Sequence, residues 1–235
     1  MLPVAVLAGG LASRLRPLTE VVPKAMIEVD GEPFVHWQLR LLLRSGIKKV
    51  VFCVAYRSEM IQDFVGDGSK YGIEVTYSED GPALLGTAGA IRKALPLLGE
   101  DFMVLYGDSY LPIDYAAVET AFRVAQKPAL MTVYRNEGAF DTSNVIFANA
   151  TLQKYAKGIQ DPAMTHIDYG LSIFNHSAFD SQSANYSTDL SDICANLSVA
   201  GQLGGYEVHE RFYEIGSLKG IEDFREYVER NRDVL

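Results

Sequence analysis

The first half of the chain alternates continuously apolar runs with segments in which apolar residues recur at helical spacing. Runs such as "PVAVLA" (3–8) and "DFMVLY" (101–106) stop abruptly at glycine, which is typical of strands buried on both faces. Between them, "PFVHWQLRLLLR" (33–44) has the period of an amphipathic helix, with Pro33 in its first turn. The pattern predicts strands over 3–8, 48–56, 73–79, 101–106 and 129–134, and helices over 33–44, 58–65, 86–98 and 114–126. Thr87 is a candidate cap for the third of these helices.

The second half has a less regular pattern. Strands are predicted over 143–147, 150–155, 166–174, 203–208 and 211–215, a capped helix over 188–201, and an amphipathic helix over 217–232. The order strand, helix, strand predicts an α/β fold, a Rossmann-like three-layer sandwich with a mostly parallel central sheet and helices on both faces. Because neither a repeat nor a linker interrupts the pattern, we expect one domain over residues 1–235.

Composition and charge limit the kinds of binding partner and the cellular compartment that we expect for this protein. The 235 residues suffice for one sizeable α/β domain, and the net charge of -9 with a pI near 4.9 disfavours nucleic acid or an anionic membrane as a partner. No stretch approaches the ~20 apolar residues of a membrane span, and the first residues lack the basic and apolar regions of a signal peptide. The two cysteines, Cys53 and Cys194, form no CxxC motif, and Cys53 lies in an apolar run. We therefore expect a cytoplasmic protein.

Positive charge is concentrated in the loop after the first strand. The stretch "LAGGLASRLRPLTEVVPKAM" (7–26) gathers two arginines and a lysine against a single glutamate. Gly9 and Gly10 allow a tight turn that brings backbone N–H groups close to an anion. Arg14 offers a planar fork of donors for phosphate oxygens, and Lys24 a point charge on a flexible stem. The loop has neither the P-loop pattern nor the GxGxxG spacing. An anion site is predicted, with a solvated surface loop as the alternative.

The order of residues in this loop resembles the signature of the sugar-1-phosphate nucleotidyltransferases, roughly GGxGTRLxPLTxxxPK. The residues in register are Gly9, Gly10, Arg14, Leu15, Pro17, Leu18, Thr19, Pro23 and Lys24, whereas Ala12 and Ser13 stand where the family has glycine and threonine. Further matches follow in family order, namely "LLGTAGAI" (84–91), "LYGDS" (105–109), "YAKG" (155–158), "DYGL" (168–171) and "FYEIGS" (212–217). The resemblance implies a fold of the nucleotide-diphospho-sugar transferase type, with residues 1–110 binding the nucleotide and 111–235 the sugar phosphate.

The resemblance also implies roles for particular residues in the first half of the chain. Arg14, Lys24 and Asp108 would be the catalytic residues. The nucleotide would be bound by Leu7, Ala8, Gly9, Gly10, Glu79, Gly86 and Thr87, of which the last three would approach the base. Asp108 and Glu214 would hold Mg²⁺, because a carboxylate beside a triphosphate repels it unless a cation lies between them. The alternatives are a turn-capping aspartate at Asp108 and a solvent-facing glutamate at the end of a strand at Glu214.

In the second half, Lys157 resembles the family lysine that binds the sugar phosphate, with an exposed structural lysine as the alternative and Lys154 as a competitor. Asp168 and Gly170 occupy the region in which relatives contact sugar hydroxyls. Asn144 joins them, with a turn asparagine as the alternative.

The segment "SEDGPALLGTAG" is the one in which relatives bind the nucleotide base, so its residues indicate which base is preferred. It contains no glutamine, which uridylyl and thymidylyl relatives often carry here, and its acidic residues are reminiscent of guanylyltransferases, because a carboxylate accepts from guanine N–H groups. The sequence therefore predicts Mg²⁺-dependent transfer from an NTP, with a lean to GTP, to a heptose or hexose 1-phosphate. The alternatives are a uridylyltransferase for a hexose- or muramate-type 1-phosphate and a catalytically silent nucleotide-sugar-binding regulator. The sequence does not predict an oligomeric state.

Overall fold

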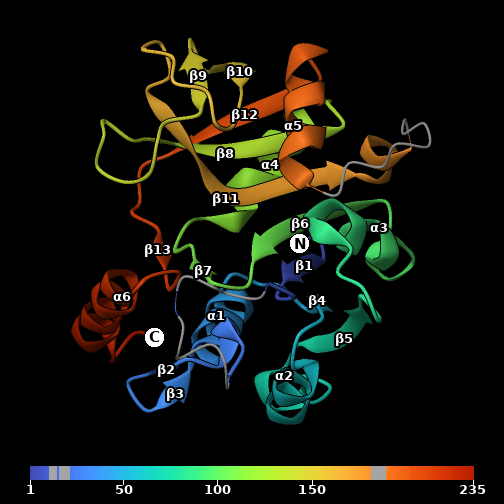
Figure 1. Ribbon diagram of the computed structural model, residues 1–235, viewed down its shortest axis with the longest axis vertical. Helices are drawn as coiled ribbons and strands as arrows, with labels where there is room; N and C mark the ends of the chain where they lie inside the picture. The colour runs from blue at the N-terminus through green and yellow to red at the C-terminus, as the bar shows by residue number, and fades with distance from the viewer. Residues whose placement is uncertain (11–14, 16–21, 181–188) are drawn as a thin grey trace.

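A central sheet organises the molecule, and the structure, a computed structural model, describes residues 1–10, 15, 22–180 and 189–235 (Figure 1). In these residues the sheet has nine strands, in the order β10-β9-β11-β6-β1-β4-β5, with β8 pairing with β11 and with β12. The strands of the first half are β1 (Val4–Leu7), β4 (Lys49–Val54), β5 (Glu74–Glu79) and β6 (Asp101–Tyr106). All neighbours among them are parallel, so their carboxyl ends meet at one edge of the sheet.

The strands of the second half extend this sheet with mixed pairing. They are β8 (Ala129–Arg135), β9 (Val145–Ala148), β10 (Thr151–Tyr155), β11 (His166–Asn175) and β12 (Leu203–Val208). The long strand β11 runs antiparallel to β6, β8 and β9, while β12 is parallel to β8. The α/β fold expected from the sequence is confirmed, with the antiparallel strand β11 joining its two halves.

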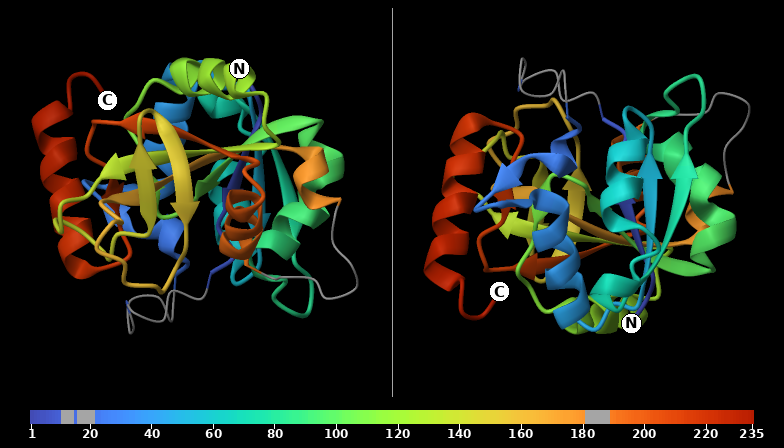
Figure 2. Two further views of the ribbon diagram at one scale, coloured as in Figure 1. Left: turned by 90° about the horizontal axis from the view of Figure 1, so that it is seen from above. Right: turned by 90° about the horizontal axis from the view of Figure 1, so that it is seen from below.

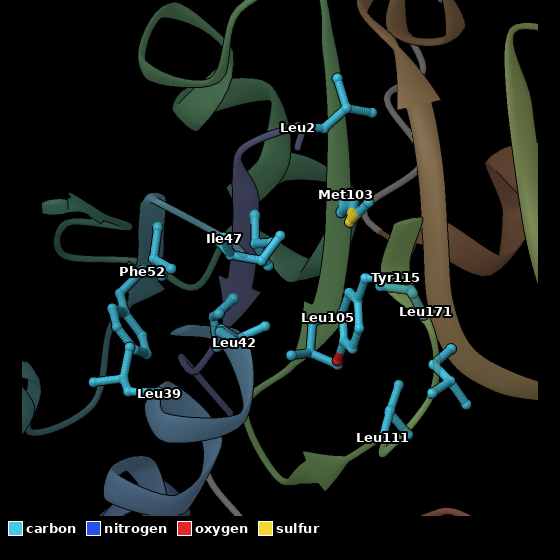
Figure 3. Close-up of a cluster of buried hydrophobic side chains, with 14 of the residues drawn as sticks. Leu2, Leu39, Leu42, Ile47, Phe52, Met103, Leu105, Leu111, Tyr115 and Leu171 are labelled. Carbon is cyan, nitrogen blue, oxygen red and sulfur yellow. The ribbon is translucent and has the colours of Figure 1, made fainter. Parts of the chain in front are cut away.

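Helices cover both faces of the sheet because successive strand residues point to opposite faces. The helices are α1 (Phe34–Arg44), α2 (Ser58–Val65), α3 (Gly86–Leu98), α4 (Tyr115–Ala125), α5 (Leu190–Val199) and α6 (Leu218–Asn231). On one face, α1, α2 and α4 pack in a cluster with Val4, Val6 and Phe52. Figure 3 shows side chains of this cluster, among them Leu39 and Leu42 of α1. On the other face, α3 and α5 pack against Ala5 and Val51. The three layers are thus helix, sheet and helix.

A smaller third cluster lies beside the sheet and is built on α6. Phe224 and Val228 of α6 pack with Phe34 and Trp37 of α1. In both views of Figure 2, α6 and α3 lie at opposite sides of the molecule. The cluster includes a two-stranded antiparallel ribbon of β7 (Ser109–Tyr110) and β13 (Tyr213–Glu214). The strand predicted over 211–215 is therefore only two residues long, and it pairs outside the main sheet.

Five further elements are short. A hairpin is formed by β2 (Glu28–Val29) and β3 (Glu32–Pro33), and 3₁₀ turns lie at η3 (Lys24–Met26), η4 (Ser69–Tyr71) and η5 (His176–Phe179). Within the described part of the chain, no helix is both long and apolar enough to cross a bilayer.

Candidate active site

The glycine turn after β1 and the turn after β6 lie side by side at the carboxyl edge of the sheet. The Gly107 N–H donates to the Leu7 carbonyl at 2.9 Å, and the Ala8 N–H donates to the Cys53 carbonyl at 2.8 Å. A Cβ atom at Gly107 would lie 2.9 Å from the Leu7 carbonyl oxygen, and one at Gly9 would lie 3.2 Å from the Ala55 Cβ atom. Glycine is needed at position 107 because a Cβ atom there would collide with the backbone of β1, and Gly9 packs tightly against Ala55. Asp108 therefore follows directly on a fixed turn.

Gln38 holds the turn after β6 in place through two hydrogen bonds. This α1 side chain is fully buried, and its amide donates to the Tyr106 carbonyl at 2.9 Å and to the Ser109 carbonyl at 2.8 Å. The two hydrogen bonds hold the backbone on either side of Asp108. Sequence reasoning missed Gln38, although a glutamine among the apolar residues of "VHWQLRLL" is a signal that could have revealed it.

The first of two cavities opens above the glycine turn and has a volume of about 260 Å³. Of the predicted nucleotide-binding residues, those in its wall are Leu7, Ala8, Gly9, Gly10, Gly86 and Thr87. Glu79 is not among the described residues that line the cavity, because its carboxylate faces outward and accepts from the Gln62 amide at 2.7 Å. The adjacent residue, Asp80, lines the cavity instead.

Thr87 does not cap α3 as expected, because it is bound to α5. Its hydroxyl accepts from the Leu190 N–H at 2.7 Å and lies 3.3 Å from Oδ1 of Asp189. Leu85 is the N-cap residue of α3 and makes no side-chain capping hydrogen bond. The hydroxyl thus ties the first turns of the two helices together beside the cavity.

The second cavity has a volume of about 980 Å³ and lies between the second half of the sheet and the start of α6. The four predicted sugar-phosphate residues, Asn144, Lys157, Asp168 and Gly170, all line it, as does Glu214. Sequence reasoning did not single out the other polar and aromatic groups in this wall, including Phe140, Arg211, Phe212 and Tyr213.

The two cavities meet at three residues that line both, Lys24, Tyr106 and Asp108. Lys24 lies in η3, and its Nζ atom is 2.6 Å from Oδ2 of Asp108. About a quarter of each side chain is accessible, at 27% and 26%. This lysine–aspartate pair therefore remains open to ligands in both cavities.

Glu214 is brought to the same place by the β7–β13 ribbon. It pairs with Ser109, and the next residue, Ile215, donates its N–H to the Asp108 carbonyl at 3.0 Å. A side chain at Gly220 would overlap the Glu214 carbonyl, so α6 can approach only because glycine stands there. The Glu214 side chain is exposed to the cavity, and the protein atoms packed around it desolvate its carboxylate in part. This desolvation, together with the charge of Asp108, raises the pKa of Glu214 to about 7, while Lys24 opposes the shift.

The repulsion between Asp108 and Glu214 makes them a donor pair suited to a hard cation. Within the described residues, no group of three or more histidine, cysteine or acidic side chains could hold a metal ion. Mg²⁺ fits such a pair, because it commonly takes one or two carboxylates and completes its shell with substrate phosphates and water.

Asp168 forms the floor of the second cavity together with Asn144 and Gly170, which the sequence also predicted as site residues. Its N–H donates to Oδ1 of Asn144 at 2.9 Å, and its own Oδ1 accepts from the Gly170 N–H at 3.0 Å. Gly170 has a φ of +105°, which a residue with a side chain rarely adopts. Burial raises the pKa of Asp168 to about 6, against the Gly170 hydrogen bond and the charge of Lys157.

Lys157 and its competitor Lys154 have different surroundings. The Lys154 ammonium lies 3.2 Å from Oδ2 of Asp161, whereas Lys157 is exposed and lines the cavity. Arg14, together with Ala12 and Ser13, lies outside the described residues, so its role stays a prediction.

Comparisons with known proteins identify the family. The family model described as nucleotidyl transferase matches residues 4–231, so the chain belongs to this family, and the resemblance inferred from the loop is confirmed. The chain is 42% identical over 118 residues to an N-acetylmuramate α-1-phosphate uridylyltransferase of Neisseria meningitidis, covering 49% of this chain and 51% of the relative. It is 35% identical over 115 residues to a D-glycero-α-D-manno-heptose 1-phosphate guanylyltransferase of Campylobacter jejuni, covering 48% and 51%. The chain thus spans about half the length of each of these relatives.

Solved structures agree on the fold. The inositol-1-phosphate CTP transferase of T. maritima superposes with a TM-score of 0.82 at 20% identity, covering 100% of this chain and 98% of that one. At this identity the likeness concerns the fold alone.

Proposed function

We propose that the protein is a Mg²⁺-dependent nucleotidyltransferase that transfers a nucleoside monophosphate from GTP to a heptose or hexose 1-phosphate, releasing pyrophosphate. The observation that carries this proposal is the meeting of two cavities at Lys24 and Asp108. A reaction that joins two phosphorylated substrates needs two binding sites with a common wall at the reacting atoms.

The division of the chain supports the assignment of each cavity. Every described residue in the wall of the first cavity falls within 1–110, the half expected to bind the nucleotide. The second cavity is lined mainly by residues of 111–235, the half expected to bind the sugar phosphate. Lys24 and Asp108 are the charged groups of the first half that line both cavities, together with Tyr106.

The chemistry requires charge neutralisation rather than a base. The phosphate oxygen of the acceptor is already an anion, and it would attack the α-phosphorus in line with the departing pyrophosphate. Lys24 would hold phosphate oxygens of both substrates and reduce their repulsion. Asp108 and Glu214 would hold Mg²⁺, which neutralises phosphate charge when bound. Arg14 is expected to stabilise the pyrophosphate.

On the acceptor side, Lys157 would bind the sugar phosphate, and Asp168 and Asn144 would accept and donate hydrogen bonds at sugar hydroxyls. Their positions in one cavity wall support these roles. The Asn144–Asp168–Gly170 hydrogen bonds would hold the acceptor in a fixed orientation, which is the main contribution that binding makes to a reaction of this type.

The test is pyrophosphate release with Mg²⁺, crossing four NTPs with a panel of hexose and heptose 1-phosphates and muramate 1-phosphate. A preferred pair that includes GTP is expected. A preference for UTP with the muramate substrate would favour the alternative that the N. meningitidis relative suggests. Tight Mg²⁺-independent binding of a finished nucleotide sugar, with no pyrophosphate released by any pair, would replace the transferase by a regulator.

A further inference from the structure

The loop that follows β8 begins with a strained turn. Glu137 and Gly138 both have a positive φ, at 48° and 78°, and the Ala139 N–H donates to the Asn136 carbonyl at 2.8 Å across them. A positive φ is uncommon for a residue with a side chain and costs free energy, so it persists only where other contacts hold the backbone. The turn leads directly into Phe140, which lies in the wall of the second cavity.

Asn136 supplies the contacts that hold this loop, residues 137–143. It is buried, with 1% of its surface exposed. Its NH₂ group donates to the Asp141 carbonyl at 2.7 Å and to the Ser143 hydroxyl at 3.0 Å. Its Oδ1 atom accepts from the Phe140 N–H at 3.1 Å. One buried side chain therefore fixes the backbone on both sides of the Phe140 ring.

Both ends of the loop are attached beside the floor of the second cavity. The N–H groups of Asn136 and Asn144, the residues on either side of the loop, donate to carbonyls at and just before the start of β11, each at 3.0 Å. Asn144 in turn accepts from the Asp168 N–H. The loop is thus placed relative to the residues that are expected to bind the sugar.

The Phe140 ring is half-buried and packs in an aromatic group. Its centroid lies 4.7 Å from that of Phe212 and 5.9 Å from that of Tyr134. The Arg211 guanidinium lies 5.7 Å from the same centroid and forms an ion pair with Asp223 of α6. Phe140 and Phe212 both line the cavity, but Phe212 is buried, so Phe140 is the more accessible of the two rings.

Resting on the proposed function, we infer that the Phe140 ring binds the apolar face of the acceptor's sugar ring and that Asn136 is the positioning residue that holds Phe140 there. A face of a pyranose presents C–H groups, whose partial positive charge suits the negative face of an aromatic ring. Asn144 and Asp168 would then take hydroxyls at the ring edge. A sugar held between an aromatic wall and a hydrogen-bonding floor has a fixed orientation relative to Lys24, which in-line attack requires.

The experiment compares two classes of probe by titration calorimetry, with Mg²⁺ and the α,β-methylene analogues of the four NTPs present. The hexose and heptose 1-phosphates carry a sugar ring, whereas inorganic phosphate has none. Phe140→Ala and Phe140→Leu remove the aromatic face. Asn136→Asp keeps the oxygen that accepts from the Phe140 N–H and removes both amide donors. Phe147→Leu is the matched control, because Phe147 is a half-buried residue of β9 that is not among the described residues lining the cavity.

The wild-type protein is expected to bind at least one of these sugar 1-phosphates more tightly than inorganic phosphate. Phe140→Ala should weaken that sugar 1-phosphate roughly three- to tenfold and leave inorganic phosphate unchanged, with a smaller loss in Phe140→Leu. Asn136→Asp should show the same selectivity, because it displaces the ring and not the phosphate site. A merely structural role of Asn136 would instead lower the melting temperature and weaken both probes together. Phe147→Leu should retain the wild-type affinity for both.

The inference would be overturned by a wild-type protein that binds none of the sugar 1-phosphates more tightly than inorganic phosphate, by unchanged sugar affinity in a folded Phe140 variant, or by equal losses for both probes. Phe140→Leu, which keeps aliphatic volume, decides the matter if Phe140→Ala does not fold. Failure of the proposed function is a separate result. A protein that binds sugar 1-phosphates through Phe140 but releases no pyrophosphate keeps this inference, whereas pyrophosphate release with unchanged acceptor affinity in the variants keeps the transferase and loses the aromatic contact.

Discussion

Asp168 lies on the floor of the second cavity with a carboxylate that is costly to ionise. We expect Asp168→Asn to stabilise the folded protein at neutral pH while it weakens acceptor binding. Asparagine retains the internal contact, because its amide oxygen can accept from the Gly170 N–H as the aspartate does. The variant therefore removes the charge and little else.

The magnitude and sign follow from the pKa of Asp168, which burial raises from 3.8 to about 6. Because the folded state holds the proton more tightly than the unfolded state, this group's contribution to stability is fully present below the unfolded pKa. It is lost as the pH rises through the folded pKa. A shift of about two pKa units corresponds to a loss of about 3 kcal/mol above pH 6.

The assay is urea unfolding of both proteins between about pH 3.5 and pH 8. The free energy of unfolding of Asp168→Asn, relative to wild type, should rise by up to about 3 kcal/mol across this range. Asp161→Asn is the control with the opposite sign, because the Ala163 N–H and Lys154 lower the pKa of Asp161. Parallel curves for wild type and Asp168→Asn would refute the reasoning. Under the proposed function, Asp168→Asn should also raise KM for the acceptor while GTP binding is unchanged.

Three further predictions concern the junction of the two cavities. Lys24→Met and Asp108→Asn should each lower the rate of pyrophosphate release roughly hundred- to thousandfold with little change in melting temperature, and near-wild-type rates would contradict the roles assigned to them. Gln38→Met should lower the free energy of unfolding by roughly 1–3 kcal/mol for each buried carbonyl that loses its donor, measured with urea, and an unchanged midpoint would show that the carbonyls find other donors. Gly107→Ala should lower turnover more than stability. Its Cβ atom would lie 2.9 Å from the Leu7 carbonyl oxygen of β1 and would displace the turn before Asp108. Unaltered kinetics would show that the turn adapts.

Most helices and strands could be predicted from the sequence because their apolar periods are regular. The parallel strands read as continuous apolar runs, and α6 has a clear amphipathic pattern. Strand pairing is a tertiary property, so the antiparallel position of β11 between β6 and β8 has no local signal. The β7–β13 ribbon is shorter still, with two residues in each strand, and depends on the packing of α6 against α1.

The candidate site was predictable where motif and strand end coincide. Lys24, Asp108 and Glu214 are far apart in the sequence, and the resemblance already grouped them. Which of two adjacent acidic residues lines the first cavity could not be decided in this way. Glu79 is the last residue of β5 and binds Gln62 outside the cavity, whereas Asp80 follows the strand, lines the cavity and accepts from the Leu85 N–H.

The electrostatics of the second cavity explain why a cation belongs to the proposed function. Asp108, Asp168 and Glu214 line a cavity in which a dianionic sugar phosphate would have to bind, and both Asp168 and Glu214 have raised pKa values. Lys24 neutralises Asp108, but it cannot also offset Glu214 and two incoming phosphates. A divalent cation between Asp108 and Glu214 would convert the most acidic part of the wall into a site for phosphate. Under the proposed function, a cation that arrives with the nucleotide would allow the acceptor phosphate to approach the α-phosphorus in a protein with a net charge of -9.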